Sequence, residues 1–349
     1  ANLFFVILLC FSFSNTSSYS LELDRAISSL YNFQIDSCIY KLNNLALENK
    51  EDALIPFLKI AAEWQNILLN EGHDLSYEVI YNGIDSAVPF YLDMIDKYPN
   101  DPSYPLFLGS LYGLKSRIDL AQSNWIDLVI SGARGYKYID KSRQIDSLYY
   151  DVYMPIGTLE YFLCRSSPSI QLIGKLFGMQ SDCTEAIAKL ETASSHSRFS
   201  WIESRNVLSY IYLYIERDYK KALAVSSSIA NQFQGHPYFA YLKAEALVKL
   251  EKYQDFENYE KDLQQFYLQG PKNQKIECYD KYLYLKALIA FQNNKYSESE
   301  KLCSQIIEGY QVEFKWILGF AHLMRGKSIE IMGDRNRAIS DYKNAVKYL

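Results

Sequence analysis

The sequence predicts an all-α protein, an α-solenoid of stacked antiparallel helix pairs. Apolar residues recur at helical spacing almost everywhere from Ser20 onward, and no convincing alternating strand pattern occurs. Short breaks separate segments of helical length, which predicts paired antiparallel helices. Composition alone points the other way, because 31 of the 349 residues are tyrosine and aromatic residues favour strands. The periodicity outweighs this propensity.

The composition is that of a folded protein without an electrostatic footprint for nucleic acid. Hydrophobic residues make up 49% of the chain and charged residues 22%, which provides ample apolar surface for a core. The formal net charge is -5, so no nucleic-acid partner is expected.

The first residues have the pattern of an export signal. Residues 3–11 are an uninterrupted apolar run, and small polar residues follow at 14–18. This predicts a secretory signal peptide over residues 1–18, truncated at its start because no basic segment precedes the run. The run is shorter than the roughly 20 apolar residues that span a bilayer. We therefore expect an exported, periplasmic or extracellular protein without an integral span after cleavage. Peripheral membrane association, or tethering by an uncleaved run, stays open.

The number and spacing of the cysteines beyond this segment do not match those of a disulfide framework. Five remain, an odd number, and none forms a C-x-x-C pair. We expect buried apolar core residues, with a Cys164–Cys183 bridge as the alternative.

The helical segments can be followed in order along the chain. Residues 201–216 and 219–233 each carry an apolar stripe at spacings of three and four, for example Tyr210, Ile211 and Tyr214. Breaks fall at 98–102, 235–237, 270–271 and 333–334. Pro89 and Pro155 lie inside helical patterns, so a kink or break is expected at each.

A helix-turn-helix unit repeats along these segments. Its second helix has a characteristic position near the start, mostly filled by a small residue. These positions are Cys38, Ala87, Ala121, Ala186, Ala222, Phe256, Ser299 and Ala338. Residues 105–128 match best, with Leu108-Gly109 and Tyr112 before Ala121.

This pattern resembles the tetratricopeptide repeat (TPR) family. The resemblance implies a right-handed superhelix whose concave face is lined by the first helix of each pair. We expect TPR-like repeats over residues 19–140 and 181–349, with an irregular helical insertion at 141–180 interrupting them.

Sequence signatures of catalysis are absent. No phosphate-binding glycine loop, H-E-x-x-H or G-x-S-x-G string occurs, and the four histidines are far apart. We therefore expect no enzyme activity, no cofactor and no metal. Glu160, in an apolar and aromatic stretch, is expected to be buried and paired. The alternative is an envelope enzyme or enzyme subunit with a site near 144–178, where Glu160 would share a pocket with His196 or Arg165.

The TPR resemblance implies a non-enzymatic scaffold or adaptor that binds a protein or peptide partner in its concave groove. Aromatic side chains with a polar edge are frequent anchors at interfaces. The alternatives are that these rings pack against a neighbouring helix, or that the protein is a membrane-tethered assembly factor. The groove positions carried over are Ile211, Tyr214, Tyr238, Tyr241, Tyr284, Phe291, Phe320 and Lys327.

Overall fold

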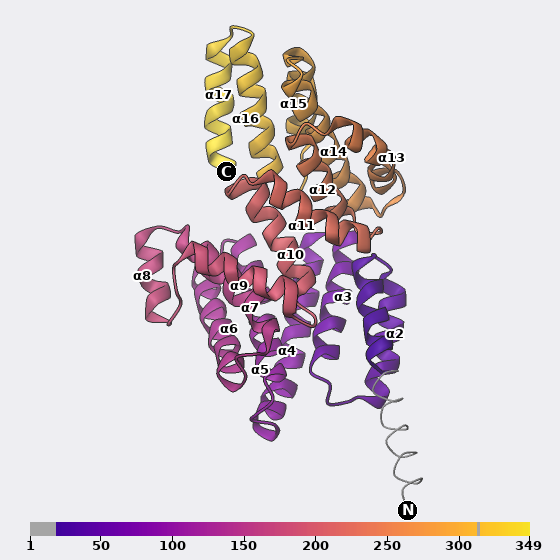
Figure 1. Cartoon of the computed structure of the whole chain (residues 1–349), viewed down its shortest axis with the longest axis vertical. Helices are drawn as coiled ribbons and strands as arrows, with labels where there is room; N and C mark the ends of the chain where they lie inside the picture. Colours follow the sequence, from indigo (N-terminus) through magenta and orange to yellow (C-terminus); the bar gives the residue numbers. More distant parts are fainter. Residues whose placement is uncertain (1–18, 313–314) are drawn as a thin grey trace, which may run out of the picture. The chain divides into compact units, whose positions relative to one another are not determined.

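The computed structural model describes residues 19–312 and 315–349, and these residues contain helices and no strand (Figure 1). The all-α prediction is confirmed, while the predicted signal peptide at 1–18 lies outside the described residues. The chain forms two compact units. Of the described residues, 19–68 and 72–204 belong to one unit, and 69–71 and those from 205 onward belong to the other. Among the described helices, none is both long enough and apolar enough to cross a membrane.

The first unit is a series of consecutive helices packed on their neighbours. A helical segment at 19–31 comes first. The labelled elements are α2 (Ile35–Glu48), α3 (Leu54–Asn70), α4 (His73–Lys97), α5 (Ser103–Ala121), α6 (Trp125–Ile145), η1 (Tyr150–Val152), α7 (Tyr153–Cys164), α8 (Pro168–Leu176) and α9 (Cys183–His196). Helix α5 packs on α4 and α6, and α7 packs directly on α9. A continuous apolar core extends from Leu23 to Ile156.

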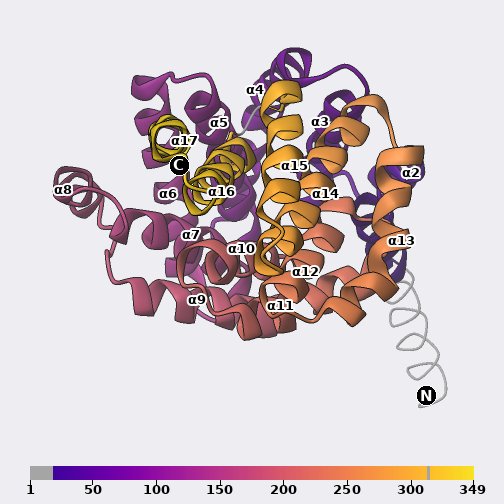
Figure 2. The ribbon, with the colours of Figure 1, turned by 90° about the horizontal axis from the view of Figure 1, so that it is seen from above.

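The described residues of the second unit form four helix pairs, and the first helix of these begins at Trp201, just before the boundary at 205. Its elements are α10 (Trp201–Tyr210), its π-helical continuation η2 (Ile211–Ile215), α11 (Tyr219–Gln232), α12 (Pro237–Lys249), α13 (Tyr253–Gln269), α14 (Lys272–Gln292), α15 (Tyr296–Gly309), α16 (Trp316–Ile331) and α17 (Arg335–Tyr348). The first helices of successive pairs also contact one another, α12 on α14 and α14 on α16 (Figure 2). This is the predicted solenoid arrangement, in which stacked pairs share their core.

One type of turn joins the two helices of many pairs. A residue with positive φ ends the first helix, and the next residue caps the second. At Glu251, with φ 56°, the backbone N–H donates to Val248 O at 3.0 Å, and the Lys252 N–H donates to Leu247 O at 3.0 Å. This is the Schellman geometry, which satisfies the last carbonyls of a helix. Positive-φ residues precede the second helix in the same way at Phe33, Ser123, Arg217, Asn294 and Gly333.

Six of the eight predicted positions fall in the first turn of a helix, and Ala121 and Ala87 do not. Ala222 and Ala338 stand four residues after the capping residues Asp218 and Asp334, and both are fully buried. Ala121 does not open a second helix, because it is the last residue of α5. Ala87 lies in the middle of α4 rather than near its start.

Two glycines replace the small residue in the α5–α6 pair. A Cβ at Gly109 would meet the Gly135 carbonyl oxygen at 2.7 Å, and a Cβ at Gly135 would meet the Gly109 oxygen at 2.9 Å. The two helices therefore approach each other at these glycines. The small residues that allow this close approach are therefore Gly109 and Gly135, not the predicted Ala121.

The prolines and cysteines correct two further expectations. Helix α4 continues through Pro89, so of the predicted kink or break the break does not occur. Pro155 lies in the first turn of α7, where the missing N–H has no partner to lose. Cys164 and Cys183 form a disulfide, the alternative that the sequence left open. Cys38, Cys278 and Cys303 are buried and free, as expected.

Candidate functional site

The second unit gathers aromatic side chains from the first helices of different pairs. Tyr214 of η2 lies 5.0 Å from Trp316 and 5.6 Å from Phe320 of α16, measured between ring centroids. Phe320 lies 6.2 Å from Tyr284 of α14, and Tyr210 of α10 meets the Trp316 ring edge-on at 6.4 Å. Such offset and edge-to-face pairs are favourable ring geometries. The first pair of the unit thus meets the fourth through its side chains.

A buried carboxylate lies beneath these rings. Glu245 of α12 is buried and accepts a hydrogen bond from the Tyr214 hydroxyl through Oε2. Its other oxygen, Oε1, accepts no hydrogen bond within the described residues, and the Lys249 ammonium is 3.5 Å from it. Burial raises the pKa of Glu245, and the Lys249 charge and the Tyr214 hydroxyl only partly offset this. Glu245 is therefore a costly group to bury, stabilised by one hydrogen bond from Tyr214 and by the nearby charge of Lys249.

An ion pair stands beside it on α14. The Lys281 ammonium is buried, lies 2.7 Å from Glu277 Oε1, and sits 4.0 Å from the centroid of the Tyr238 ring. The Tyr238 hydroxyl donates to Glu277 Oε2 at 2.8 Å. Burial disfavours the charged ammonium, but the Glu277 carboxylate, together with Tyr210 and Cys278, more than compensates and the pKa of Lys281 is raised. Lys281 is therefore a buried cation, supported by both a carboxylate and an aromatic face.

A small cavity remains between the rings and these charges. It is lined by Tyr210, Tyr214, Tyr238, Tyr241, Glu245, Lys281, Tyr284 and Trp316, with flanking aliphatic residues. The free space is about 10 Å³, which is close to what one water molecule needs. The site is thus an aromatic cluster closed around the space of a single water.

The structure brings five of the eight predicted groove residues together. Tyr214, Tyr238, Tyr241 and Tyr284 line the cavity, and Phe320 stacks on Tyr214.

The other three groove residues lie elsewhere. Ile211 is buried in η2, Phe291 lies further along α14 with its ring 5.6 Å from Tyr296, and Lys327 is exposed on α16. That any of the eight contacts a partner stays a prediction.

The sequence reading missed four residues of this site: Tyr210, Glu245, Lys281 and Trp316. Two of them had a signal, because Tyr210 and Trp316 stand four residues before Tyr214 and Phe320 on the same helical stripe. Glu245 is an acid within the apolar run Ala244–Val248, the same kind of signal that drew attention to Glu160.

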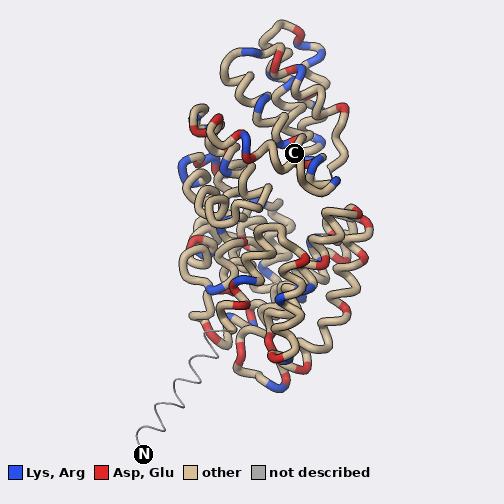
Figure 3. The backbone as a smooth tube through the Cα atoms, turned by 90° about the vertical axis from the view of Figure 1, so that its right-hand side faces the viewer, with Lys and Arg blue, Asp and Glu red and all other residues tan. Residues whose placement is uncertain are grey.

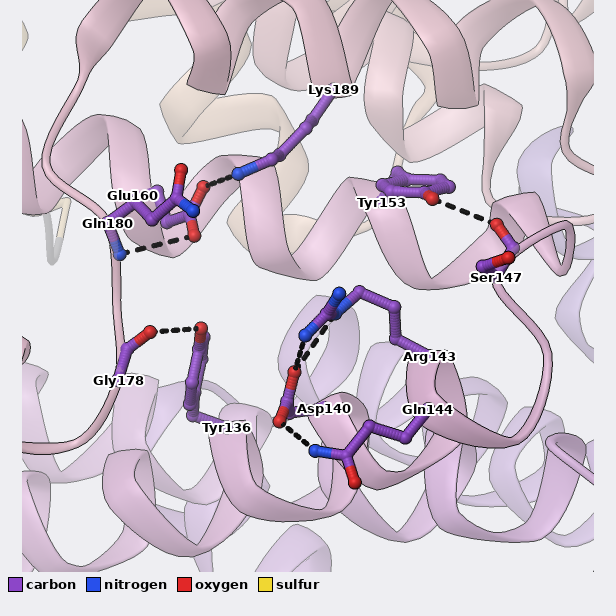
Figure 4. A network of polar contacts seen from close by, with 10 residues as sticks. All are labelled: Tyr136, Asp140, Arg143, Gln144, Ser147, Tyr153, Glu160, Gly178, Gln180 and Lys189. Atoms are coloured by element: carbon purple, nitrogen blue, oxygen red, sulfur yellow. Dashed lines mark hydrogen bonds and ion pairs between the residues drawn. The ribbon is translucent and has the colours of Figure 1, made fainter.

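The region at 144–178 holds a polar network of a different kind (Figure 4). Glu160 is buried, pairs with the Lys189 ammonium and accepts a hydrogen bond from the Gln180 N–H at 3.3 Å, so its prediction is confirmed. His196 instead lies 5.3 Å from the Tyr150 ring, and Arg165 lies 5.6 Å from the Tyr161 ring. In the described ranges, no three His, Cys, Asp or Glu side chains are placed to hold a metal ion.

Comparison with known proteins adds little to this description. No protein-family model matches the chain, and no curated protein matches it. A crystal structure of the P58(IPK) TPR domain matches with 12% sequence identity and a TM-score of 0.24, over 95% of this chain and 93% of that one. A TM-score this low carries no argument. The architecture therefore rests on the helix contacts within the structure itself.

Proposed function

We propose that the protein is an exported, non-enzymatic scaffold that binds a segment of a protein partner through the aromatic cluster of its second unit. The observation that carries the proposal is the convergence of Tyr210, Tyr214, Tyr284, Trp316 and Phe320 from the first helices of three pairs. Rigid aromatic rings with polar edges are the side chains that most often dominate binding energy at interfaces.

A partner would bind by contacting the accessible parts of the rings and the polar groups already present in the cluster. Trp316, Phe320 and Tyr214 are half-buried, so each keeps part of its ring accessible to a partner. Glu245 Oε1, which faces the Lys249 ammonium at 3.5 Å but accepts no hydrogen bond, supplies an acceptor for a partner donor, because a buried acceptor without a hydrogen bond gains most from a new one. Since the free space is about 10 Å³, a large side chain enters only if Trp316 or Phe320 moves outward.

The other parts of the proposal have separate support. Lysines, arginines and carboxylates are interspersed along both units, as on protein surfaces in general, and are not gathered by sign as a nucleic-acid partner would require (Figure 3). Export is supported by the apolar run at 3–11 and by the Cys164–Cys183 disulfide, because disulfides persist mainly in oxidising compartments. The enzyme alternative depended on Glu160, which Lys189 already engages.

A peptide selection tests the binding site. Random peptides displayed on phage are selected on the full chain, and the dissociation constants of the resulting peptides are measured by fluorescence anisotropy. We expect Trp316→Ala to weaken binding about tenfold or more, and Trp316→Phe to weaken it less because a ring remains. The matched control is Trp125→Ala, an exposed tryptophan of α6, which should change affinity by no more than about twofold.

The outcome that contradicts the proposal is equally definite. If the selected peptides bind Trp316→Ala and Tyr214→Ala as tightly as the wild type, the cluster is only a core. Circular dichroism of each variant confirms that the helices are retained. Export is tested separately, by sequencing the N-terminus of protein recovered from outside the cytoplasm.

A further inference from the structure

The segment between Cys164 and Cys183 is an excursion from the first unit. Helix α7 packs directly on α9, and the disulfide joins the end of α7 to the start of α9 with 5.5 Å between the Cα atoms. The chain therefore leaves and returns at almost the same place. Helix α8, which lies between the two cysteines, packs on α7 and projects away from the other helices (Figures 1 and 2).

One side of this excursion is fixed to the unit by specific contacts. The Gln171 side chain donates to the carbonyl oxygens of Cys164 and Ser166 at 3.1 and 3.0 Å. Gly174 is buried against Leu163, with which any Cβ at this position would collide. At the end of the excursion, the Gly178 carbonyl accepts a hydrogen bond from the Tyr136 hydroxyl at 3.2 Å (Figure 4). The orientation of α8 about its own axis is therefore defined.

This orientation turns a broad apolar face outward. Leu172 is 62% exposed and Leu176 is 78% exposed. At 100° per residue, the exposed apolar residues of the excursion cover an arc of roughly 160°. They are Ile170, Leu172, Ile173, Leu176 and Phe177. Exposed large apolar side chains gathered in this way mark an interaction site.

The charges around this face indicate what it contacts. The chain as a whole carries a formal charge of -5, yet no acidic residue occurs from 161 through 181. The charged residues of this stretch are Arg165 and Lys175, and both are exposed. A convex apolar face flanked by cations complements an apolar layer bordered by anions. That is the interfacial region of a bilayer containing anionic lipids.

We propose that this excursion docks the protein on an anionic membrane surface. The apolar face of α8 inserts among the lipid headgroups, and Lys175 and Arg165 pair with anionic phosphates. The disulfide and the Gln171 and Tyr136 contacts keep the excursion ordered before it binds, so little conformational entropy is lost on docking. This surface lies in the first unit and does not depend on the aromatic cluster of the second.

Vesicle co-sedimentation tests the proposal. The full chain is mixed with phosphatidylcholine vesicles that contain either none or about 30% phosphatidylglycerol. The same series with the chain from Tyr19 onward separates any binding by the apolar run at 3–11. We expect the wild type to bind the anionic vesicles, and Leu172→Ser/Leu176→Ser to reduce the partition coefficient about tenfold or more. Lys175→Glu should reduce binding several-fold, about three- to tenfold, on anionic vesicles only.

A matched control and a second measurement make the result decisive. Leu47→Ser/Val346→Ser removes two equally exposed apolar side chains elsewhere, at 73% and 82% exposure, and should bind as the wild type does. The proposal is overturned if the wild type does not sediment with anionic vesicles, or if Leu172→Ser/Leu176→Ser sediments equally well. It is also overturned if light scattering shows a wild-type dimer that this double variant dissociates, because α8 would then be an interface between two copies.

Discussion

The positive-φ turn gives a prediction in which a glycine stabilises a helical protein. Glu251 adopts φ 56°, is exposed, and makes its contribution to the turn through its backbone N–H alone. A left-handed conformation costs an L-residue about 1–2 kcal/mol. Glycine removes that cost. It also gives the unfolded chain more conformational freedom, which lowers the free energy of unfolding by about 0.4–1 kcal/mol. Glu251→Gly should therefore raise the free energy of unfolding of the second unit by about 0.5–1 kcal/mol.

Two companion substitutions separate the backbone effect from the loss of the side chain. Glu251→Ala keeps the Cβ and should leave stability within about 0.5 kcal/mol of the wild type. Gly333→Ala should lower stability by about 1–2 kcal/mol, because Gly333 has φ 101° and a Cβ there meets no atom within 4 Å. Any loss at this position is therefore conformational rather than steric.

The measurement is thermal and urea-induced unfolding followed by circular dichroism and tryptophan fluorescence. For a unit of this size, the stabilisation corresponds to a rise of about 1–4 °C in the melting temperature. If Glu251→Gly is no more stable than Glu251→Ala, the left-handed turn carries no strain. The account of how these helix pairs close would then be incorrect.

Three further predictions concern other parts of the molecule. Replacing Cys164 and Cys183 by serine opens a loop with a sequence separation of 19 and should destabilise the first unit by about 3 kcal/mol, measured by urea unfolding. Burial, with Glu277 nearby, raises the pKa of Asp280 to about 7, so the native state keeps a proton that the unfolded chain has released. Stability should therefore fall as the pH rises from about 4 to about 7, by up to about 4 kcal/mol, and Asp280→Asn should remove this dependence in melting curves recorded across that range. Tyr214→Phe removes only the hydrogen bond to the buried Glu245 and should cost about 1–3 kcal/mol; equal stability would show that the carboxylate finds another donor.

The helix pairs could be predicted because their information is local. The apolar stripes at spacings of three and four, the capping residues Asp218 and Asp334, and the buried Ala222 and Ala338 all act within one or two turns of helix. The turn residues could not be predicted in the same way. Glu251 is not a residue that favours positive φ, and only the packing of both helices holds it there.

The candidate site was less predictable because it depends on the relative orientations of several successive helix pairs. The contact of Tyr214 with Trp316 and Phe320 joins the first pair of the unit to the fourth, across two intervening pairs. Small rotations between successive pairs determine whether such rings meet, and no local pattern encodes their sum. For the same reason, the 5.5 Å between the Cα atoms of Cys164 and Cys183 follows from the packing of α7 on α9, not from their spacing.

The common turn also determines where the chain can change its length. One residue added between the helices of a pair would rotate the second helix by about 100° and carry Ser299 or Ala338 off its buried face. The connections from one pair to the next have no such constraint, and they already differ: for example, two residues connect α13 to α14 at 270–271 and five connect α4 to α5 at 98–102. Insertions, deletions and engineered tags should therefore be tolerated between pairs and rejected within them.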